Sequence, residues 1–430
     1  MPPAHTGAPV VTGASTPSSP PPRSAAEPLS PGRPGYRRMS LALFAAGLAT
    51  FALLYSTQAL LPAISEGLGV TAGQASWTVS AATGALALCV LPLSALSERF
   101  GRTRMMTWSM VLAVGVGLLA PFAPNVEWLI ALRAVQGAAI AGIPASAMAY
   151  LAEEVRPKAL VGAIGLFVAG NSIGGMSGRV VGGWAAQLGG WRVGLASVAV
   201  LALACAAAFL VLLPRARFFR PASLDPRAVG RTVAGHLRDP LLVRLYGIGA
   251  LFMTVFGAVY TVIGYRLVDE FSLGQGVVGS VFLVYLVGTA SSAAAGRLVE
   301  RAGRRGALYL AVTTTALGLL LSLSQSPAAI VAGLVLITAG FFAGHAVASA
   351  AVSRTARTGR AQASALYQSA YYLGSSAGGT LGALAYHSAG WAATVGIALL
   401  AVLGVVSITL YGSHAARAER RTMAPAAAAR

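Results

Sequence analysis

The stretch Leu96-Ser97-Glu98-Arg99-Phe100-Gly101-Arg102-Thr103-Arg104 is a short charged turn between two long apolar segments. A closely similar turn, Leu298-Val299-Glu300-Arg301-Ala302-Gly303-Arg304-Arg305, follows 202 residues later, counted from glutamate to glutamate. A second repeat has an offset of 200 residues: Gly174, Gly178, Gly182 and Trp191 recur as Gly374, Gly378, Gly382 and Trp391. Two matched halves in an apolar chain predict a transporter built of two lobes.

The composition is that of a membrane protein. Of the 430 residues, 56% are hydrophobic and only 10% are charged, whereas soluble domains carry about a quarter charged residues. Uncharged runs recur along the chain, each long enough for the roughly 20 residues with which a helix crosses a bilayer. No alternating pattern typical of membrane strands repeats. We therefore predict an all-α membrane protein with twelve transmembrane helices in two pseudo-symmetric six-helix bundles.

A polar stretch divides the chain in its middle. Residues 1–36 are proline-rich and have no apolar signal segment, so we expect a disordered cytoplasmic tail. The first bundle is expected over 37–213, a cytoplasmic linker over 214–240, the second bundle over 241–413 and a C-terminal tail over 414–430. The predicted spans are 39–61, 75–96, 105–124, 128–152, 160–188, 192–213, 241–266, 275–296, 307–325, 328–352, 362–388 and 391–412.

The net charge of +19 would suit a nucleic-acid partner, but the distribution of the charge argues against one. With the N-terminus placed inside, 27 of the 31 lysines and arginines fall in cytoplasmic segments or, for Arg244, in the first turn of the span that follows one. This is the positive-inside pattern, so both termini are expected in the cytoplasm and no nucleic acid is expected. The two cysteines, Cys89 and Cys205, lie in apolar stretches, so we expect no disulfide, metal or cofactor.

Each charged turn has the residues of a latch between helices. A glutamate ends the preceding span, and a glycine that permits a tight turn follows among arginines. The carboxylate is placed to face the positive N-terminus of a neighbouring helix or an arginine. Because the turn occurs in both halves, we predict a gating role; ordinary polar turns with anchoring arginines are the alternative. The predicted gating residues are Glu98, Arg99, Gly101, Arg102, Glu300, Arg301, Gly303 and Arg304.

These turns resemble the loop motif G-x-L-A-D-R-x-G-R-K of the major facilitator superfamily. The matching residues of the first turn are Leu96, Glu98, Arg99, Gly101 and Arg102. Ser94 replaces the leading glycine and Thr103 the final lysine, whereas the second copy has Gly296 and Arg305 at these positions. The resemblance covers about residues 37–413. It implies the fold of that family and, together with the composition, a multi-pass protein of a bacterial cell (inner) membrane.

Two further elements are similar to motifs of the same family. Residues 132–137, with Arg133 and Gln136, resemble its R-x-x-Q-G element. An arginine in hydrocarbon is costly unless it faces protein or water; an arginine that snorkels to the interface is the alternative. Residues 174–183 resemble the antiporter motif G-x-x-x-G-P-x-x-G-G, with Arg179 in the proline position, which implies export. Simple close packing of helices is the alternative, and the predicted packing glycines are Gly174, Gly178, Gly182, Gly374, Gly378 and Gly382.

Polar residues within the spans are predicted to line a central cavity and bind substrate: Tyr55, Gln58, Arg133, Gln136, Asn171, Arg179, His345 and Gln368. Tyr55 and Gln58 could instead bond across helices. His345 is either a packing residue or a proton carrier, because histidine titrates near neutral pH. No aspartate or glutamate lies inside a predicted span, and uncompensated arginines repel a cation. An anionic or neutral amphipathic substrate is therefore favoured.

The stretches 55–62 and 170–179 resemble the acriflavine-sensitivity branch of bacterial drug:proton antiporters. The sequence thus predicts a secondary active transporter that exports small amphipathic molecules, drugs or metabolites, in exchange for protons by alternating access. An importer or facilitator of a sugar or organic anion is the alternative, and a receptor or scaffold a remote one. No nucleophile or phosphate-binding pattern indicates an enzyme. The expected partners are a small-molecule substrate, a proton and the lipid bilayer, and we expect a monomer.

Overall fold

The computed structural model describes residues 27–32, 34–219, 221 and 226–428, and helices make up nearly all of this part of the chain. The first half contains α1 (Pro34–Leu54), η1 (Gln58–Leu60), α2 (Leu61–Leu68), α3 (Ala72–Phe100), α4 (Arg102–Leu119), η2 (Ala120–Phe122), α5 (Val126–Ile140), α6 (Gly142–Glu154) and α7 (Pro157–Leu212). The second half contains α8 (Pro226–Arg238), α9 (Pro240–Asp269), α10 (Gln275–Ser280), η3 (Val281–Val284), α11 (Tyr285–Leu321), α12 (Pro327–Thr355) and α13 (Arg360–Ala428).

Nine helices of the described chain are long and apolar enough to cross a membrane, counting consecutive pieces such as α1 to α2 as one. Three of these nine are divided by residues with non-helical backbone angles: α7 at Gly189 and Gly190, α11 at Gly303, and α13 at Ala389 and Gly390. Division at these points gives twelve membrane-crossing segments, consistent with the predicted number. The predicted all-α membrane fold is confirmed.

Glycine makes the sharp turns between adjacent spans possible. Gly101, between α3 and α4, has φ +103°, and Gly303, inside the second charged turn, has φ +70°. Gly190 and Gly390 also have positive φ, at +75° and +71°. A residue with a Cβ is strained in this region, so both charged turns reverse the chain at a glycine for the same steric reason.

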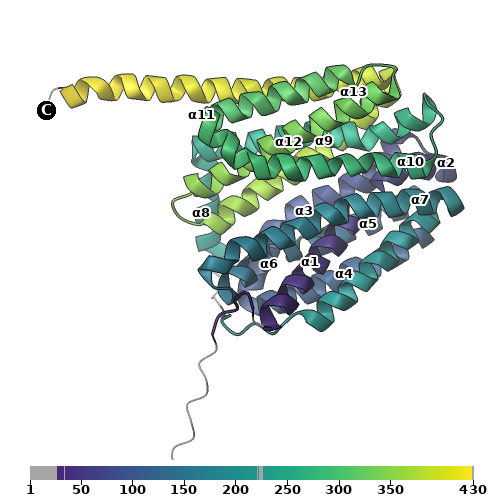
Figure 1. Ribbon diagram of the computed structural model, residues 1–430, viewed down its shortest axis with the longest axis horizontal. Coiled ribbons are helices and arrows are strands. Elements are labelled where there is room, and N and C mark those ends of the chain that lie inside the picture. The colour runs from purple at the N-terminus through teal and green to yellow at the C-terminus, as the bar shows by residue number, and fades with distance from the viewer. Residues whose placement is uncertain (1–26, 33, 220, 222–225, 429–430) are drawn as a thin grey trace, which may run out of the picture.

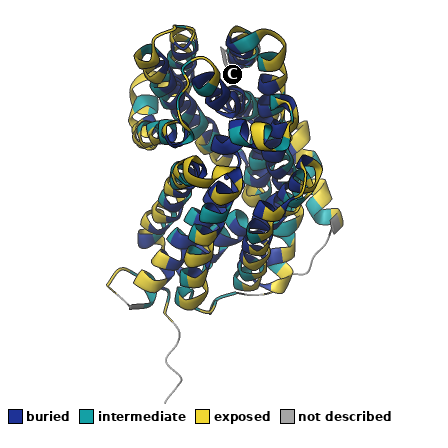
Figure 2. Cartoon of the chain, turned by 90° about the vertical axis from the view of Figure 1, so that its right-hand side faces the viewer, coloured by how far each residue is buried: buried dark blue, intermediate teal, exposed yellow. Residues whose placement is uncertain are grey.

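The twelve segments form two bundles, which we call the N lobe (34–212) and the C lobe (240–412). Figure 1 shows them stacked, with α1 and α3 to α7 below and α9 to α13 above. The two charged turns, α8 and the start of α13 lie at one end, which we call the turn face; α2 and α10 lie at the other, the opposite face. Figure 2, viewed from the opposite face, shows buried residues on the inner sides of each bundle and exposed ones outside.

Glycine rows hold the helices of each lobe together. A methyl group added at Gly170, Gly174 or Gly178 of α7 would lie within 2.7 Å of the α1 backbone. In the C lobe, a methyl at Gly374, Gly378 or Gly382 of α13 would lie within 2.7 Å of the α9 backbone. Backbones that approach this closely leave room only for glycine, the arrangement of small-residue packing in membranes. Gly182 instead faces Val198, on the second arm of α7, at 3.1 Å.

The segments outside the bundles contact them at the turn face. Residues 1–26 and 33 of the predicted N-terminal tail lie outside the described residues, but 27–32 pack against the N lobe. There Leu29 donates its N–H to the Glu154 carbonyl at 2.7 Å, and Arg156 donates to the Leu29 carbonyl at 3.0 Å. The Glu154 carboxylate accepts from the backbone N–H groups of Arg217 and Phe218, at 2.6 and 2.8 Å. One glutamate at the end of α6 therefore fixes the start of the linker.

Candidate substrate site and gates

The first span is broken in the middle, and a buried arginine fills the break. Arg133 of α5 donates to the carbonyls of Leu53 (2.7 Å) and Leu54 at the end of α1, and to the Thr78 carbonyl of α3 (3.0 Å). It also donates to the Gln136 side chain, which in turn donates to the Ala113 carbonyl at 2.9 Å. Arg133 thus stabilises the negative C-terminal end of α1 within the N lobe. It is 0% and Gln136 1% exposed.

The break positions Tyr55 and Gln58 beside Arg179 of α7. The Arg179 Nε and Nη2 groups donate to Gln58 Oε1 at 2.9 and 2.5 Å, and its Nη1 donates to the Gly175 carbonyl. The guanidinium carbon lies 4.4 Å from the centre of the Tyr55 ring. Arg179 is 2% exposed. Three of the predicted cavity residues are therefore brought together at one point.

This cluster also crosses between the lobes. The Arg179 guanidinium lies 4.7 Å from the Phe282 ring and 5.0 Å from the Tyr285 ring, both of the C lobe. Gln58 Nε2 donates to Thr261 Oγ1 of α9 at 3.4 Å. Gln58 and Thr261 are 203 residues apart, close to the repeat offset, so residues at nearly equivalent positions of the two halves meet where the lobes join.

Further hydrogen bonds between described residues join the lobes on the side of the opposite face. Ser65 and Tyr265 share a hydrogen bond of 2.6 Å between their hydroxyls, and Trp184 Nε1 donates to Ser280 Oγ at 3.0 Å. Nearer the middle, Ser80 Oγ donates to the Ser376 carbonyl at 3.0 Å. These bonds join α2 to α9, α7 to α10 and α3 to α13. The opposite face is therefore closed.

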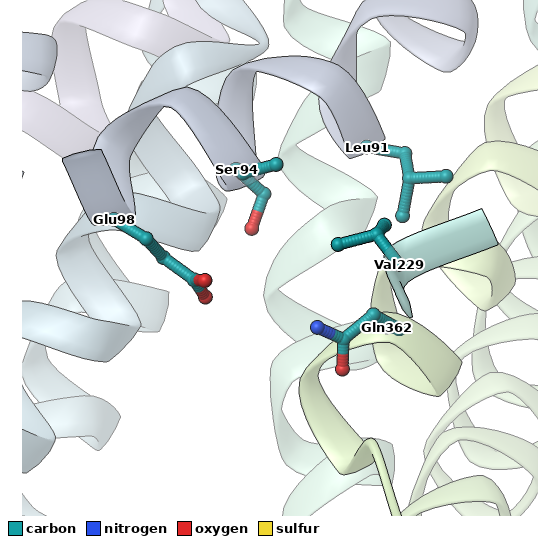
Figure 3. Close-up of a pocket in the computed structure, with 6 residues that line it drawn as sticks. Leu91, Ser94, Glu98, Val229 and Gln362 are labelled. Carbon is teal, nitrogen blue, oxygen red and sulfur yellow. The ribbon is translucent and has the colours of Figure 1, made fainter. Parts of the chain in front are cut away.

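At the turn face the predicted first gate contacts its own lobe. Arg102 pairs with Glu98 at 3.9 Å and with Glu153 at 3.0 Å. Between the lobes lies a crevice lined by Leu91, Ser94, Ala95, Glu98, Val229 and Gln362. Figure 3 shows Glu98 and Ser94 on one wall, and Val229 of α8 with Gln362 of α13 on the other. The Glu98 carboxylate therefore lies near the first turn of α13, whose N-terminus is positively polarised.

The second charged turn is more open. Glu300, Arg301 and Arg304 are exposed, and the structure gives Glu300 no ion pair with a described residue. Arg305 donates to the Gly412 carbonyl at 3.0 Å, within the C lobe. In this conformation the two turns share their backbone geometry, but only the first has its charges paired.

The remaining predicted cavity residues lie apart from the Arg179 cluster. His345 Nδ1 and the Tyr367 hydroxyl share a hydrogen bond of 2.9 Å, and the His345 ring lies 4.7 Å from the Tyr371 ring. Asn171 faces Gly47 of α1, and its Oδ1 is buried without a hydrogen-bond partner in the part of the chain that the structure describes. Gln368 is half-buried on α13.

Sequence reasoning missed the C-lobe half of the cluster: Thr261, Phe282, Tyr285 and Tyr265. Threonine and aromatic residues are ordinary in apolar helices, so nothing in their type marks them. One signal was available, because the repeat offset places Thr261 almost opposite Gln58 and places Tyr265 opposite Ser65, which is 200 residues earlier.

A broken first span, paired glycine rows and two lobes joined through equivalent helices define a membrane transporter with two related halves. The sequence profile described as Major Facilitator Superfamily matches residues 39–266 and 245–428. The chain belongs to this superfamily, and it is a multi-pass membrane protein. The resemblance of the charged turns to this superfamily is thereby confirmed.

Curated bacterial proteins are similar over most of their length. The "Inner membrane transport protein YnfM" of Escherichia coli (strain K12) is 39% identical over 361 residues, which are 84% of this chain and 87% of that protein. The "Uncharacterized MFS-type transporter YybF" of Bacillus subtilis (strain 168) is 37% identical over 381 residues, covering 88% and 94%. Transport across a membrane is therefore the activity of this class of protein.

Solved structures share the fold at low identity. A bacterial homologue of the human lysosomal transporter Spinster, in an inward-facing and occupied conformation, superposes with a TM-score of 0.70 at 14% identity, over 90% of this chain and 98% of that one. The human organic anion transporter MFSD10 gives a TM-score of 0.65 at 18% identity, over 87% and 100%.

Proposed function

We propose that this protein is a proton-coupled exporter of small amphipathic molecules, with the turn face in the cytoplasm. The observation that carries the proposal is the asymmetry between the two ends. Hydrogen bonds and the Arg179 cluster join the lobes toward the opposite face, whereas a crevice separates Glu98 from Gln362 at the turn face. A conformation that is joined more firmly on the side away from the cytoplasm suits a substrate that enters from the cytoplasm, and the positive-inside pattern supports this orientation.

Alternating access then requires one set of contacts to break as another forms. On rocking, Gln58 would leave Thr261 and Ser65 would leave Tyr265, while Glu98 would close on the N-terminus of α13 beside Gln362. The negative Glu98 carboxylate is attracted to the positive helix end, so this contact would hold the cytoplasmic side shut. The glycine rows keep each lobe rigid during the motion, because they lie inside the lobes and not between them.

The proton would be carried by His345, or by an acidic group of the substrate. Neither Arg133 nor Arg179 pairs with a carboxylate of a described residue. A membrane-embedded carboxylate that would carry the proton and attract a cation is therefore not part of the proposal. The free histidine side chain exchanges protons near neutral pH, and His345 is bonded to Tyr367 in the C lobe.

The test is transport into everted membrane vesicles, whose interior is acidified by respiration. Naphthalene-2-sulfonate, N-phenyl-1-naphthylamine and ethidium serve as anionic, neutral and cationic probes. We expect accumulation of the anionic or neutral probe that stops when nigericin collapses the pH gradient. If nigericin leaves the accumulation unchanged, the proposal of proton coupling is wrong. Release of preloaded probe in the reverse direction would instead support an importer or facilitator.

A variant with its two lobes cross-linked tests whether transport requires the lobes to rock against each other. A Cβ at Gly84 of α3 would lie 3.8 Å from Ser376 Cβ of α13, the mean separation across a disulfide. In a background with Cys89 and Cys205 replaced, Gly84→Cys with Ser376→Cys should form a disulfide that stops transport, and reduction should restore it. Full transport by the cross-linked protein would refute the rocking of the lobes.

A further inference from the structure

Arg179 is a buried cation with only neutral partners. Its acceptors are the Gln58 side-chain oxygen and the Gly175 carbonyl, and it makes no ion pair with a described residue. A guanidinium has five N–H donors in a planar fork that suits a two-oxygen anion. A charge held in an apolar interior without a counterion is costly. The site therefore favours an incoming anion over any neutral or cationic group.

Aromatic rings surround this cation. Tyr55 of the N lobe and Phe282 and Tyr285 of the C lobe lie 4.4, 4.7 and 5.0 Å from its guanidinium carbon. The Tyr285 hydroxyl is buried and has no hydrogen-bond partner among the described residues. A buried hydroxyl without a partner is rare, and here it belongs to the ring that stacks near the cation. It supplies a donor for one more oxygen of a bound molecule.

The aromatic surface continues from Arg179 into the C lobe. The Tyr285 ring lies 6.0 Å from the Phe342 ring, and the Phe341 ring lies 5.1 Å from Phe342 and 6.0 Å from His345. Phe342, His345 and Tyr371 are only half-buried. Because α12 runs from the opposite face toward the turn face, this row of rings leads from Arg179 toward the turn face.

We propose that Arg179 binds the negative group of a planar aromatic anion, and that this binding loosens the closed side of the transporter. The aromatic body of the anion stacks along Tyr285, Phe342 and His345. The inference rests on the proposed transport function and names its substrate class: amphipathic molecules with one negative charge and a flat apolar body.

The coupling step is an exchange of hydrogen-bond acceptors. An anionic oxygen is a stronger acceptor for the guanidinium than the neutral Gln58 amide. Gln58 now accepts from Arg179 while donating to Thr261 of the other lobe at 3.4 Å. When the anion displaces it, the Gln58 side chain, which links η1 to α9, loses its hydrogen bonds from Arg179. Substrate binding from the turn face thereby weakens the junction that must open for release.

Binding to the purified full-length protein in detergent tests recognition. Naphthalene-2-sulfonate and its neutral analogue naphthalene-2-sulfonamide are titrated by calorimetry into the wild type, Arg179→Gln, Arg179→Lys and Arg192→Gln. Arg192 is the control, on the second arm of α7: its guanidinium carbon lies 4.2 Å from the centre of the Trp191 ring, within one lobe. We expect the sulfonate to bind the wild type and Arg192→Gln about tenfold more tightly than the sulfonamide, the scale of a charge-assisted hydrogen bond.

Loss of this preference in Arg179→Gln, with partial retention in Arg179→Lys, supports the proposal. Equal binding of the two probes to the wild type overturns it, as does a preference that survives in Arg179→Gln. Should Arg179→Gln not fold, the comparison of Arg179→Lys with the wild type still decides, because lysine keeps the charge and loses the planar fork.

A second readout tests the coupling. In a background without Cys89 and Cys205, Ser280→Cys at the closed side is labelled with a membrane-impermeant maleimide. The sulfonate should raise the labelling rate severalfold and the sulfonamide should not; an unchanged rate overturns the exchange of acceptors. Thr261→Val, which lacks the acceptor of Gln58, should raise labelling without any probe. If proton-driven export fails while the preference for the sulfonate is intact, the proposed function alone is wrong. If export is proton-driven but the sulfonate is not preferred, only this inference is wrong.

Discussion

Replacement of Gly174 by alanine measures how much the close contact between α7 and α1 contributes to stability. The new methyl would lie 2.2 Å from the Leu48 carbonyl oxygen and 2.6 Å from Leu48 Cα. Both atoms are backbone, so no side-chain rotation relieves the clash. Ordinary contact needs roughly 3.5 Å, so the two helices must separate by about 1 Å. Overpacking of this kind costs about 1–3 kcal/mol.

Alanine also favours the helix itself by about 1 kcal/mol relative to glycine, and a control removes this effect. Gly165 lies on the same helix, and a methyl there meets nothing within 4 Å among the described residues. Gly165→Ala gains the helix propensity without the clash. The difference in unfolding free energy between the two variants therefore isolates the packing cost. We expect Gly174→Ala to be less stable than Gly165→Ala by about 1–3 kcal/mol.

Thermal unfolding in detergent, followed with a thiol-reactive dye on the half-buried Cys89 and Cys205, measures this difference. One kilocalorie per mole corresponds to about 2–4 °C for a domain of 150–250 residues, so a cost of about 1–3 kcal/mol should lower the melting temperature of Gly174→Ala by about 2–12 °C relative to Gly165→Ala. The equivalent pair in the C lobe is Gly374→Ala, 2.1 Å from the Ala250 carbonyl oxygen, and Gly396→Ala, which faces open space. If Gly174→Ala and Gly165→Ala have the same melting temperature, the contact between the helices adapts to the added methyl group. The steric argument for both glycine rows is then wrong.

Three further substitutions test other parts of the fold. Arg133→Leu leaves the carbonyls at the break of the first span without their donor and should lower the free energy of unfolding by about 3 kcal/mol or more. The loss is measured as a lower yield of folded protein, and a fully stable variant would contradict the capping role. Gly303→Ala puts a Cβ at φ +70° and should cost about 1–3 kcal/mol, whereas Gly296→Ala on the same helix should not lower the melting temperature. Glu154→Gln weakens the clamp on the linker, and trypsin should cut there faster; an unchanged cleavage rate would show that the carboxylate is dispensable.

Most of the fold could be predicted from the repeats in the sequence. Because Gly101 and Gly303 occur in matching turns, the sequence predicted tight reversals there, and both residues have positive φ. The rows at 174–182 and 374–382 marked helices that approach others closely, though Gly182 faces the second arm of its own helix. These features are local or repeated, so a single sequence reveals them.

Pairings between distant side chains were not predictable in the same way. Arg133 and Arg179 look alike in the sequence, as lone arginines in apolar spans. In the structure Arg133 caps a broken helix inside one lobe, while Arg179 contacts both lobes. Which role an arginine takes depends on whether backbone carbonyls or aromatic rings from another helix surround it. That depends on tertiary packing, which leaves no local mark.

The two places where the lobes cross are equivalent in backbone and different in chemistry. The repeat offset of 200 relates Arg179 to Gly379, and the offset of 202 relates Ser80 to Phe282. Correspondingly, Arg179 contacts Phe282 at one crossing, and a Cβ at Gly379 would lie 3.4 Å from Ser80 Oγ at the other. The crossing of α3 with α13 is lined by glycine, serine and threonine, which slide past one another at little cost. The crossing of α7 with η3 holds a charge between rings, and its stability changes when an anion arrives. A transporter built from two similar halves thereby obtains a sliding contact on one side and a substrate-sensitive contact on the other.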